Sequence, residues 1–294
     1  YSGSVESQRR LLAALKSHSN WKRLCLSHLD MGEPAEGDGV ASLLISLLQG
    51  ANVLTDLGLE HCTNLRPGVL SLICSALVQV GMLKSIKFGF NENVGAHHMD
   101  ILLASLRRLP FVKKVSLRFT DPPFCHKPPE PLFPYSLTEL NLLDCHLKTE
   151  SLELLARALE LMTCLRKFTL RHMDFGSEMA GVIAVVRALC RGCSLEHLDL
   201  FDCRMTVAVC SPLRILFSKQ VSLRTVHLGN NDIASELLSL VDPLARLNRL
   251  AIVFLGNSWT RDCDFTPFFS LYTRNAVKVA LPGRVTWLEE LSGD

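Results

Sequence analysis

Two stretches in the C-terminal half of the chain share one spacing of apolar residues. Residues 195–205 read LEHLDLFDCRM, and residues 223–233 read LRTVHLGNNDI. In both stretches leucine or valine occupies the first, fourth and sixth positions, and cysteine or asparagine occupies the ninth. The step of two residues between the fourth and sixth positions is typical of a short strand with one buried face. Each stretch therefore predicts a strand that is followed by a turn.

The same pattern recurs along most of the chain. Nine copies begin at Trp21, Leu54, Leu83, Val112, Leu137, Leu165, Leu195, Leu223 and Leu247, the last being degenerate (LNRLAIVFLGN). Successive copies begin 33, 29, 29, 25, 28, 30, 28 and 24 residues apart. A period of this length indicates a repeat architecture, in which no unit can bury its apolar face alone and neighbouring units stack.

The segments between the copies carry apolar residues at three- and four-residue spacing, which predicts helices. These segments are 40–49, 67–80, 97–109, 150–162, 177–190 and 206–218. Pro67 suits a helix start, whereas Pro212 is expected to shift or break its helix. Residues 5–18 form a further amphipathic pattern, and we expect this helix to cap the N-terminal end of the stack.

The pattern resembles the leucine-rich repeat, L-x-x-L-x-L-x-x-[N/C]-x-L, in the longer form found in ribonuclease-inhibitor-like proteins. The resemblance covers roughly residues 20–260 and implies an α/β solenoid, or horseshoe, with parallel strands on its concave face and helices on its convex face. We expect a single domain over 1–294, with a capping helix in 1–20, about nine repeats in 21–260 and a C-terminal cap in 261–294. Because the chain begins at Tyr1 rather than at a methionine, we also expect it to be a fragment of a longer chain.

One unit departs from the rule. Residues 121–136, DPPFCHKPPEPLFPYS, contain six prolines where a helix is expected. Proline removes backbone donors and resists helix interiors, so an extended segment on the outer side is predicted. Two interpretations stay open: a degenerate repeat, or a loop that docks a partner or acts as a local hinge.

Composition narrows the class of protein further. The net charge is +2, and no apolar run approaches the length needed to span a bilayer. A nucleic-acid tail, a disordered chain and a membrane protein are therefore disfavoured. The eleven cysteines are odd in number and spread through the chain, and no Asn-x-Ser/Thr sequence occurs. This combination predicts a soluble protein of a reducing intracellular compartment, either cytoplasm or nucleus.

The residues between the buried strand positions are expected to face the concave side. Basic residues there come mostly from the first, third, fourth and sixth copies, and acidic ones from the second, fifth and seventh. This alternation has two interpretations, namely mutual pairing between neighbouring strands or a surface that reads a partner.

Large apolar residues on the same side favour a partner. Phe90 and Phe119 occupy the eighth position of adjacent copies, and Leu143 and Phe201 occupy the seventh. Exposed aromatic residues beside arginine match the composition of interface hot spots. Val253 and Phe254, near the last copy, are expected to be covered by the C-terminal segments. The predicted partner-binding residues are Lys87, Phe90, Lys114, Arg118, Phe119, Leu143, Arg171 and Phe201.

No motif for catalysis or cofactor binding emerges. Phosphate-binding, dinucleotide-binding, serine-hydrolase and zinc-protease signatures are absent from the sequence. Cys190 and Cys193 form a lone C-x-x-C without a second pair, which favours packing over a metal site. His28 and His61 occupy the same position of adjacent copies and are expected to lie close together without binding metal. Basic and aromatic residues interleave near Phe119, but acidic residues in alternate repeats interrupt any phosphate track, so nucleic-acid binding is disfavoured.

We therefore expect a non-enzymatic protein-recognition module without cofactor. The resemblance implies two intracellular uses: the substrate-binding part of a cullin-type ubiquitin ligase adapter, or the sensing or autoinhibitory region of a nucleotide-binding immune receptor. Irregular repeat lengths favour the adapter, with ligase subunits bound through regions outside this chain. Leu70, Cys74 and Val78 match an elongin-binding box only loosely, and their helical spacing indicates core. A self-assembling scaffold is the third possibility.

Overall fold

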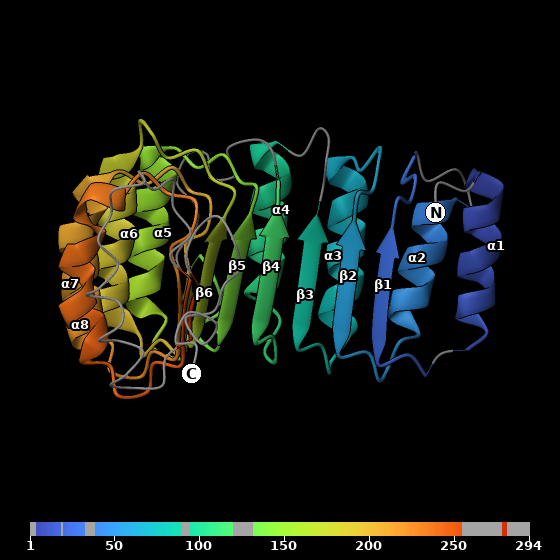
Figure 1. Cartoon of the computed structure of the whole chain (residues 1–294). Helices are drawn as coiled ribbons and strands as arrows, with labels where there is room; N and C mark the ends of the chain where they lie inside the picture. The colour runs from blue at the N-terminus through green and yellow to red at the C-terminus, as the bar shows by residue number, and fades with distance from the viewer. Residues whose placement is uncertain are drawn as a thin grey trace, which may run out of the picture. The chain divides into compact units, whose positions relative to one another are not determined.

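The computed structural model describes residues 4–18, 20–32, 39–89, 95–119, 132–254 and 278–280. These residues belong to two compact units, one made of Tyr1–Thr138 with Asp144–His146, the other of Glu139–Leu143 with Leu147–Asp294. Figure 1 traces the chain and labels its helices and strands. Each unit is described by itself. The expectation of one continuous domain over 1–294 stays a prediction.

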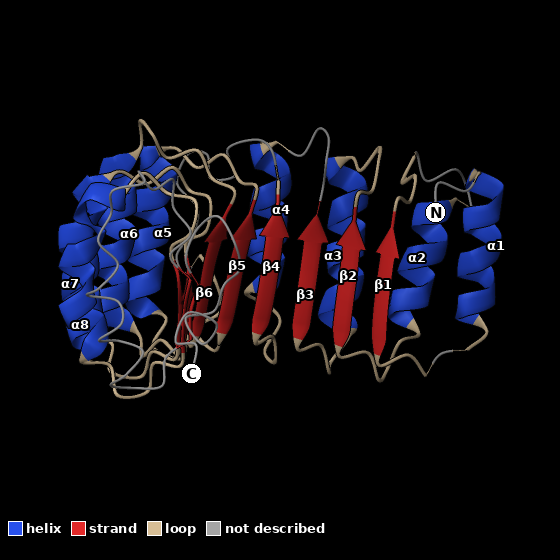
Figure 2. Ribbon diagram, in the orientation of Figure 1, coloured by secondary structure: helices blue, strands red, loops and turns tan. Residues whose placement is uncertain are grey.

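The first unit alternates helices and parallel strands in chain order. Its strands pair each with the next through equivalent positions, so that Leu24, Leu57, Ile86 and Val115 stand side by side. The helices cover one side of these strands (Figure 2). The elements are α1 (Val5–Lys16), β1 (Arg23–Ser27), α2 (Val40–Gln49), β2 (Asp56–Glu60), α3 (Pro67–Gln79), β3 (Ser85–Gly89), α4 (Ala96–Leu106) and β4 (Lys114–Arg118).

The second unit repeats this arrangement with shorter strands towards its end. Its strands are also parallel and paired in chain order. The elements are β5 (Glu139–Leu143), α5 (Thr149–Leu161), β6 (Lys167–Arg171), α6 (Met179–Gly192), β7 (His197–Asp199), η1 (Val207–Val209), α7 (Cys210–Lys219), β8 (Thr225–His227), η2 (Ala234–Leu240), α8 (Val241–Ala245), β9 (Ile252–Phe254) and β10 (Lys278–Ala280).

The core lies between the strands and the helices, at the positions that the repeat pattern predicts. Leu137, Leu140 and Leu142, at the first, fourth and sixth positions of one copy, are fully buried. Helix residues such as Leu155 and Val185 are fully buried as well. Because each such side chain contributes about 1.5–3 kcal/mol when removed from water, this shared layer stabilises the stack. The predicted fold class, parallel strands alternating with helices in a repeat solenoid, is confirmed.

The ninth position ties successive turns together through hydrogen bonds. The buried Asn231 accepts bonds from the N–H groups of Cys203 and Met205, both at 3.1 Å, and donates to the carbonyl groups of Leu200 and Leu228 at 2.7 and 2.9 Å. The Cys203 thiol, one repeat earlier, donates to backbone carbonyl groups as well. Asparagine and cysteine at the ninth position thus satisfy backbone groups of the predicted turn.

Helix α1 packs against the first repeat, and its role as an N-terminal cap stays a prediction. The side chain of the buried Gln8 donates to the His28 carbonyl at 3.1 Å and accepts from the Asp30 N–H at 2.9 Å. These backbone groups lie on the side of the first turn where a preceding repeat would lie. Leu12 of the same helix is fully buried, and α1 packs against α2.

The predicted phase of the ninth copy is wrong by three residues. Val253 stands opposite Val226, the fourth position of the preceding copy, so the copy begins at Leu250 rather than Leu247. Leu247 instead closes the turn after α8, where its carbonyl accepts the Leu250 N–H at 3.1 Å. Both Leu247 and Leu250 can serve as the first position of the pattern, so the sequence allows either starting residue. The end of α8 determines which of them the structure uses.

The other predicted elements are confirmed where the structure describes them. Pro212 lies in the first turn of α7, so the helix begins later than its apolar pattern, after a short 3-10 segment. Leu70 and Cys74 are buried in the core, as their spacing indicates. Of the proline-rich stretch only residues 132–136 are described, with Leu132 and Phe133 buried. The predicted C-terminal cap lies outside the described residues except for β10. No helix in the described ranges has the length and apolar character that crossing a bilayer requires.

Candidate functional site

The side of the strands that the helices do not cover, which we call the strand face, carries ion pairs between neighbouring repeats. Basic and acidic side chains meet in the pairs Arg23–Asp56 (3.7 Å), Lys87–Glu60 (2.8 Å), Arg118–Asp144 (2.7 Å) and Lys167–Glu139 (2.9 Å). The interpretation of alternating charge as mutual pairing is thereby confirmed. Exposed and half-exposed pairs contribute little stability, about 0.2–1 kcal/mol each, so their main effect is to neutralise the face.

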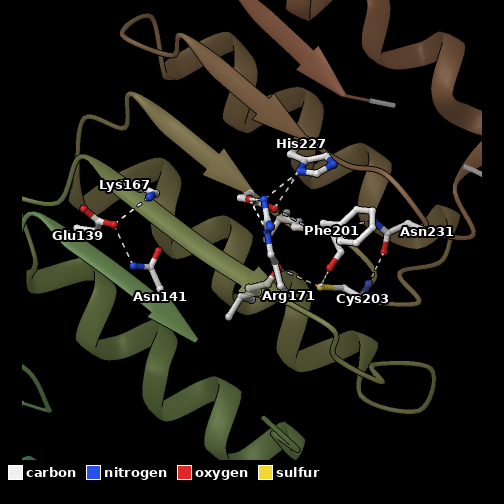
Figure 3. A network of polar contacts seen from close by, with 11 residues as sticks. Glu139, Asn141, Lys167, Arg171, Phe201, Cys203, His227 and Asn231 are labelled. Atoms are coloured by element: carbon white, nitrogen blue, oxygen red, sulfur yellow. Dashed lines mark hydrogen bonds and ion pairs between the residues drawn. The ribbon is translucent and has the colours of Figure 1, made fainter. Parts of the chain in front are cut away.

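In the second unit the ion pair between Arg171 and Asp199 is part of a larger network. The carboxylate of Asp199, on β7, accepts a hydrogen bond from Arg171 Nε on β6 at 2.7 Å and lies 3.4 Å from His227 Nδ1 on β8 (Figure 3). Burial of Asp199 acts to raise the pKa of its carboxyl group, but the hydrogen bonds and charges of His227 and Arg171 outweigh burial and lower this pKa. The Asp199 carboxylate, as an anion, therefore holds the side chains of Arg171 and His227 from the two flanking strands.

An aromatic ring completes this network. Phe201 follows β7, and its N–H donates to Asp199 Oδ1 at 3.2 Å, which fixes the backbone beneath the ring. The ring stacks on His227 with centroids 4.8 Å apart, and the Arg171 guanidinium lies 5.8 Å from its centroid. His172 meets the same ring edge-on at 5.5 Å. We call Arg171, His172, Asp199, Phe201 and His227 the Phe201 cluster.

The backbone at the eighth position turns polar side chains towards the strand face. His172, Asp202 and Asn230 have φ angles of 55°, 54° and 57°. This left-handed conformation is sparsely used by residues with a Cβ, and histidine, aspartate and asparagine are enriched in it. The Asp202 carboxylate then accepts from both neighbours, His172 Nδ1 at 2.9 Å and the Asn230 amide.

Several predicted residues fall together in the second unit. Arg171 and Phe201 belong to the Phe201 cluster, and Leu143 stands opposite Arg171 in the strand register and is half-buried. Lys87, Lys114 and Arg118 lie on β3 and β4 of the first unit, and Lys87 and Arg118 are engaged in the ion pairs given above. Phe90 lies outside the described residues.

The expectation that Phe119 is exposed is wrong. Its side chain is 1% exposed and belongs to the core. In six other copies the eighth residue is polar and has a left-handed backbone conformation. Phe119, by contrast, is not among the left-handed residues of the described chain. Without that turn of the backbone, and with a large apolar side chain, the residue at this position packs inwards.

Sequence reasoning did not single out His227 and Asn230. His227 occupies the fifth position of its copy, which the repeat pattern assigns to the strand face. The available signal was that Arg171, Asp199 and His227 lie on three consecutive strands. The chemistry of their contacts, however, depends on side-chain geometry.

The histidine and cysteine motifs have structural explanations. The rings of His28 and His61 stack 4.9 Å apart, as their equivalent positions predict. The thiols of Cys190 and Cys193 donate to backbone carbonyl groups of α6, and burial raises the pKa of Cys193 to about 12. Within the described ranges no three histidine, cysteine, aspartate or glutamate side chains are grouped as metal ligands.

Comparison with known proteins gives similar repeat proteins. No protein-family model matches the chain. The chain is 27% identical over 259 residues to a ribonuclease inhibitor from Sus scrofa, covering 86% of this chain and 48% of the inhibitor. It is 27% identical over 232 residues to a NACHT, LRR and PYD domains-containing protein 5 from Mus musculus, covering 76% of this chain and 17% of that protein. An internalin structure from Listeria monocytogenes covers 95% of this chain and 74% of its own, at 16% identity and a TM-score of 0.49.

The recurring strand–turn pattern, the parallel strands backed by helices and the asparagine and cysteine turns define a leucine-rich repeat protein, a class of protein-interaction modules. The chain spans about half the length of the curated ribonuclease inhibitors that it matches. In particular, its repeats contain helices, and in sequence the chain is similar to ribonuclease inhibitors and to NACHT, LRR and PYD domains-containing proteins.

Proposed function

We propose that this chain is a non-enzymatic protein-recognition module that binds its partner through the strand face of the second unit. The observation that carries the proposal is Phe201, a partly exposed ring held between His227, His172 and Arg171. Aromatic and arginine side chains in a fixed arrangement are the residues that most often dominate binding energy at protein interfaces.

The electrostatics of the Phe201 cluster favour a partner that offers apolar surface and hydrogen-bond acceptors. Asp199 already neutralises Arg171, whose side chain is still 40% exposed. A partner therefore does not have to bring a compensating charge. Because hydrogen bonds hold the cluster in place before binding, little side-chain entropy is lost on association.

The test compares Phe201→Ser with Ile215→Ser. Ile215 is 48% exposed on α7, in the helix layer of the same unit, so this control removes a similar apolar area from the opposite side. Partners are captured from cell lysate on wild-type protein, identified by mass spectrometry and measured again as purified proteins by biolayer interferometry. We expect Phe201→Ser to weaken binding about tenfold or more, while Ile215→Ser binds like wild type.

A ribonuclease is the first purified probe, because two relatives are ribonuclease inhibitors. Equal binding of every captured partner by wild type and Phe201→Ser, with both proteins folded by circular dichroism, would reject the Phe201 cluster as the recognition site.

A second candidate function is the leucine-rich repeat region of a NACHT-domain protein. Two similar proteins carry NACHT, LRR and PYD domains in their names, and the match to one of them covers 76% of this chain. Under this proposal the partner is another domain of the same protein. Co-expression of this chain with the NACHT domain of its own full-length protein tests it, since an intramolecular partner would co-purify with wild type and not with Phe201→Ser.

The remaining expectations stay predictions. The ubiquitin ligase adapter has no counterpart among the relatives reported above, and co-purification of cullin or elongin subunits with the full-length protein would test it. An intracellular location fits a chain whose nine described cysteines are free thiols. Self-association is tested by light scattering at increasing protein concentration.

A further inference from the structure

A row of large apolar side chains lies at the edge where the strands of the first unit begin. Val53, Met82 and Phe111 each precede the first position of a repeat, and their side chains are 39%, 49% and 55% exposed. Three residues after each of them, Asp56, Ser85 and Lys114 stand opposite one another in the parallel register. The three apolar side chains therefore follow one another across adjacent repeats, at about the spacing of neighbouring strands. We call this row the apolar ridge.

Lysine residues flank the apolar ridge. Three exposed lysines, Lys22, Lys84 and Lys113, occupy the second position of the first, third and fourth copies. Lys84 and Lys113 are direct neighbours, since the N–H of each binds the backbone of the preceding repeat at 2.7 and 2.8 Å. On the strand face the basic side chains have acidic partners, whereas no acidic side chain lies within ion-pair distance of these three lysines among the described residues.

An open hollow of about 680 Å³ is lined by Pro110, the residue before Phe111 of the apolar ridge. Its apolar wall is formed by Leu109, Pro110, Pro134 and Tyr135, and its charged wall includes Arg107 and Arg108. Tyr135 is 51% exposed. The hollow is large enough for an aromatic or leucine side chain and has a cation at its rim.

We propose that this edge is a second interaction surface, which binds an acidic protein segment whose carboxylates meet Lys84, Lys113 and Arg108 and whose apolar side chain enters the hollow. The unpaired positive charge calls for an anionic partner. An anionic membrane offers the same charge, but a bilayer surface does not supply a projecting side chain for a concave site, so the hollow favours a protein segment. This surface is separate from the Phe201 cluster and does not depend on it.

The experiment measures binding of a fluorescein-labelled peptide of roughly 12 residues, built of glutamate, leucine and one tryptophan, by fluorescence anisotropy. Two matched peptides serve as controls. In one of them glutamine replaces every glutamate, and in the other serine replaces leucine and tryptophan. The protein variants are Lys84→Glu with Lys113→Glu, and Phe111→Ser. The control is Arg214→Glu with Lys219→Glu, which makes the same charge change at two exposed residues of α7.

We expect the glutamate peptide to bind wild type about tenfold more tightly than either matched peptide, and each ridge variant to lose about tenfold in affinity while the control retains it. All substituted residues are exposed, so thermal unfolding should stay unchanged. Equal affinity for the glutamate and glutamine peptides overturns the proposal, as does an equal loss in the α7 control. Binding to vesicles of phosphatidylcholine with phosphatidylserine, without peptide binding, would overturn it in favour of a membrane surface.

Discussion

At the scale of single residues, position in the repeat does not decide exposure alone. Phe119 and Asp144 both occupy the eighth position, yet Phe119 is in the core and Asp144 pairs with Arg118 at the surface. The backbone at Asp144 is left-handed, with φ of 50°. The difference shows that a polar residue and a left-handed turn together produce the surface side chain.

The first prediction concerns Phe119. Phe119→Asp buries a carboxylate without a partner and removes core packing, so we expect it to lower the free energy of unfolding by at least about 3–5 kcal/mol. The matched control is Phe111→Asp, since Phe111 is 55% exposed in the same unit. Urea denaturation followed by circular dichroism compares the two. A fully stable Phe119→Asp variant would show that this side chain faces solvent after all.

The second prediction concerns Asn231. Asn231→Ala leaves buried turn groups, among them the Cys203 N–H and the Leu200 carbonyl, without the amide that serves them. Each buried polar group left unsatisfied costs about 1–3 kcal/mol, so we expect a loss of about 3 kcal/mol or more. Asn248→Ala, at an exposed asparagine, is the control and should unfold like wild type in the same urea titration.

At the scale of elements, close packing of helices α5 and α6 depends on glycine. A Cβ at Gly192 would overlap the Leu159 carbonyl oxygen, and one at Gly181 would lie 2.7 Å from Leu152 Cβ. The Leu159 carbonyl oxygen belongs to the backbone of α5, which cannot move aside as a flexible side chain can. The two helices therefore approach each other more closely than residues with a side chain would allow.

The third prediction follows from this packing. Gly192→Ala should destabilise the second unit by about 1–3 kcal/mol, because α6 must shift away from α5. Gly68→Ala, in α3, is the control, since nothing lies within 4 Å of a Cβ there. Alanine is the better helix former, so this control should be neutral or more stable by up to about 1 kcal/mol. Differential scanning calorimetry distinguishes the two, and an equally stable Gly192→Ala would contradict the prediction.

The fourth prediction concerns the start of α5 and its dependence on pH. Glu178, from the next repeat, accepts hydrogen bonds from the Thr149 hydroxyl and from the Thr149 N–H, the latter at 2.7 Å, and these bonds lower the pKa of Glu178. Because the pKa is lower in the folded state, the carboxylate stabilises the fold above the ordinary pKa of glutamate. This stabilisation is lost as the pH falls through the lowered pKa.

Wild type should therefore exceed Glu178→Gln in thermal stability at neutral pH, and the difference should shrink on acidification. Thermal melts between neutral and acidic pH measure it. A difference that stays constant with pH would show that the charge of Glu178 has no part in holding α5.

At the scale of the whole molecule, a stack of repeats needs its ends closed. Helix α1 does so for the first unit with Gln8 against the turn backbone and Leu12 against the apolar layer. Without it, the outermost repeat would expose apolar surface and unpaired backbone groups to other copies of the chain.

The fifth prediction tests this closure with two adjacent leucines. Leu12 is fully buried and Leu11 is 49% exposed on the same helix. Leu12→Asp should detach α1, lower the melting temperature and promote self-association, whereas Leu11→Asp should behave like wild type. Size-exclusion chromatography with light scattering reads out the association. A monodisperse, fully stable Leu12→Asp variant would mean that α1 is not a cap.

Much of this protein follows from its sequence alone. The repeat period, the inward positions such as Leu140 and the pairing of opposite charges all depend on contacts between equivalent positions of adjacent copies. Such contacts are implied once the period is known, because stacking places like beside like. The phase of the ninth copy, the burial of Phe119 and the Phe201 cluster were decided by the tertiary structure. Arg171 and His227 are 56 residues apart in sequence. Their meeting, like the inward turn of Phe119, depends on local backbone conformation and side-chain geometry that a spacing pattern does not encode.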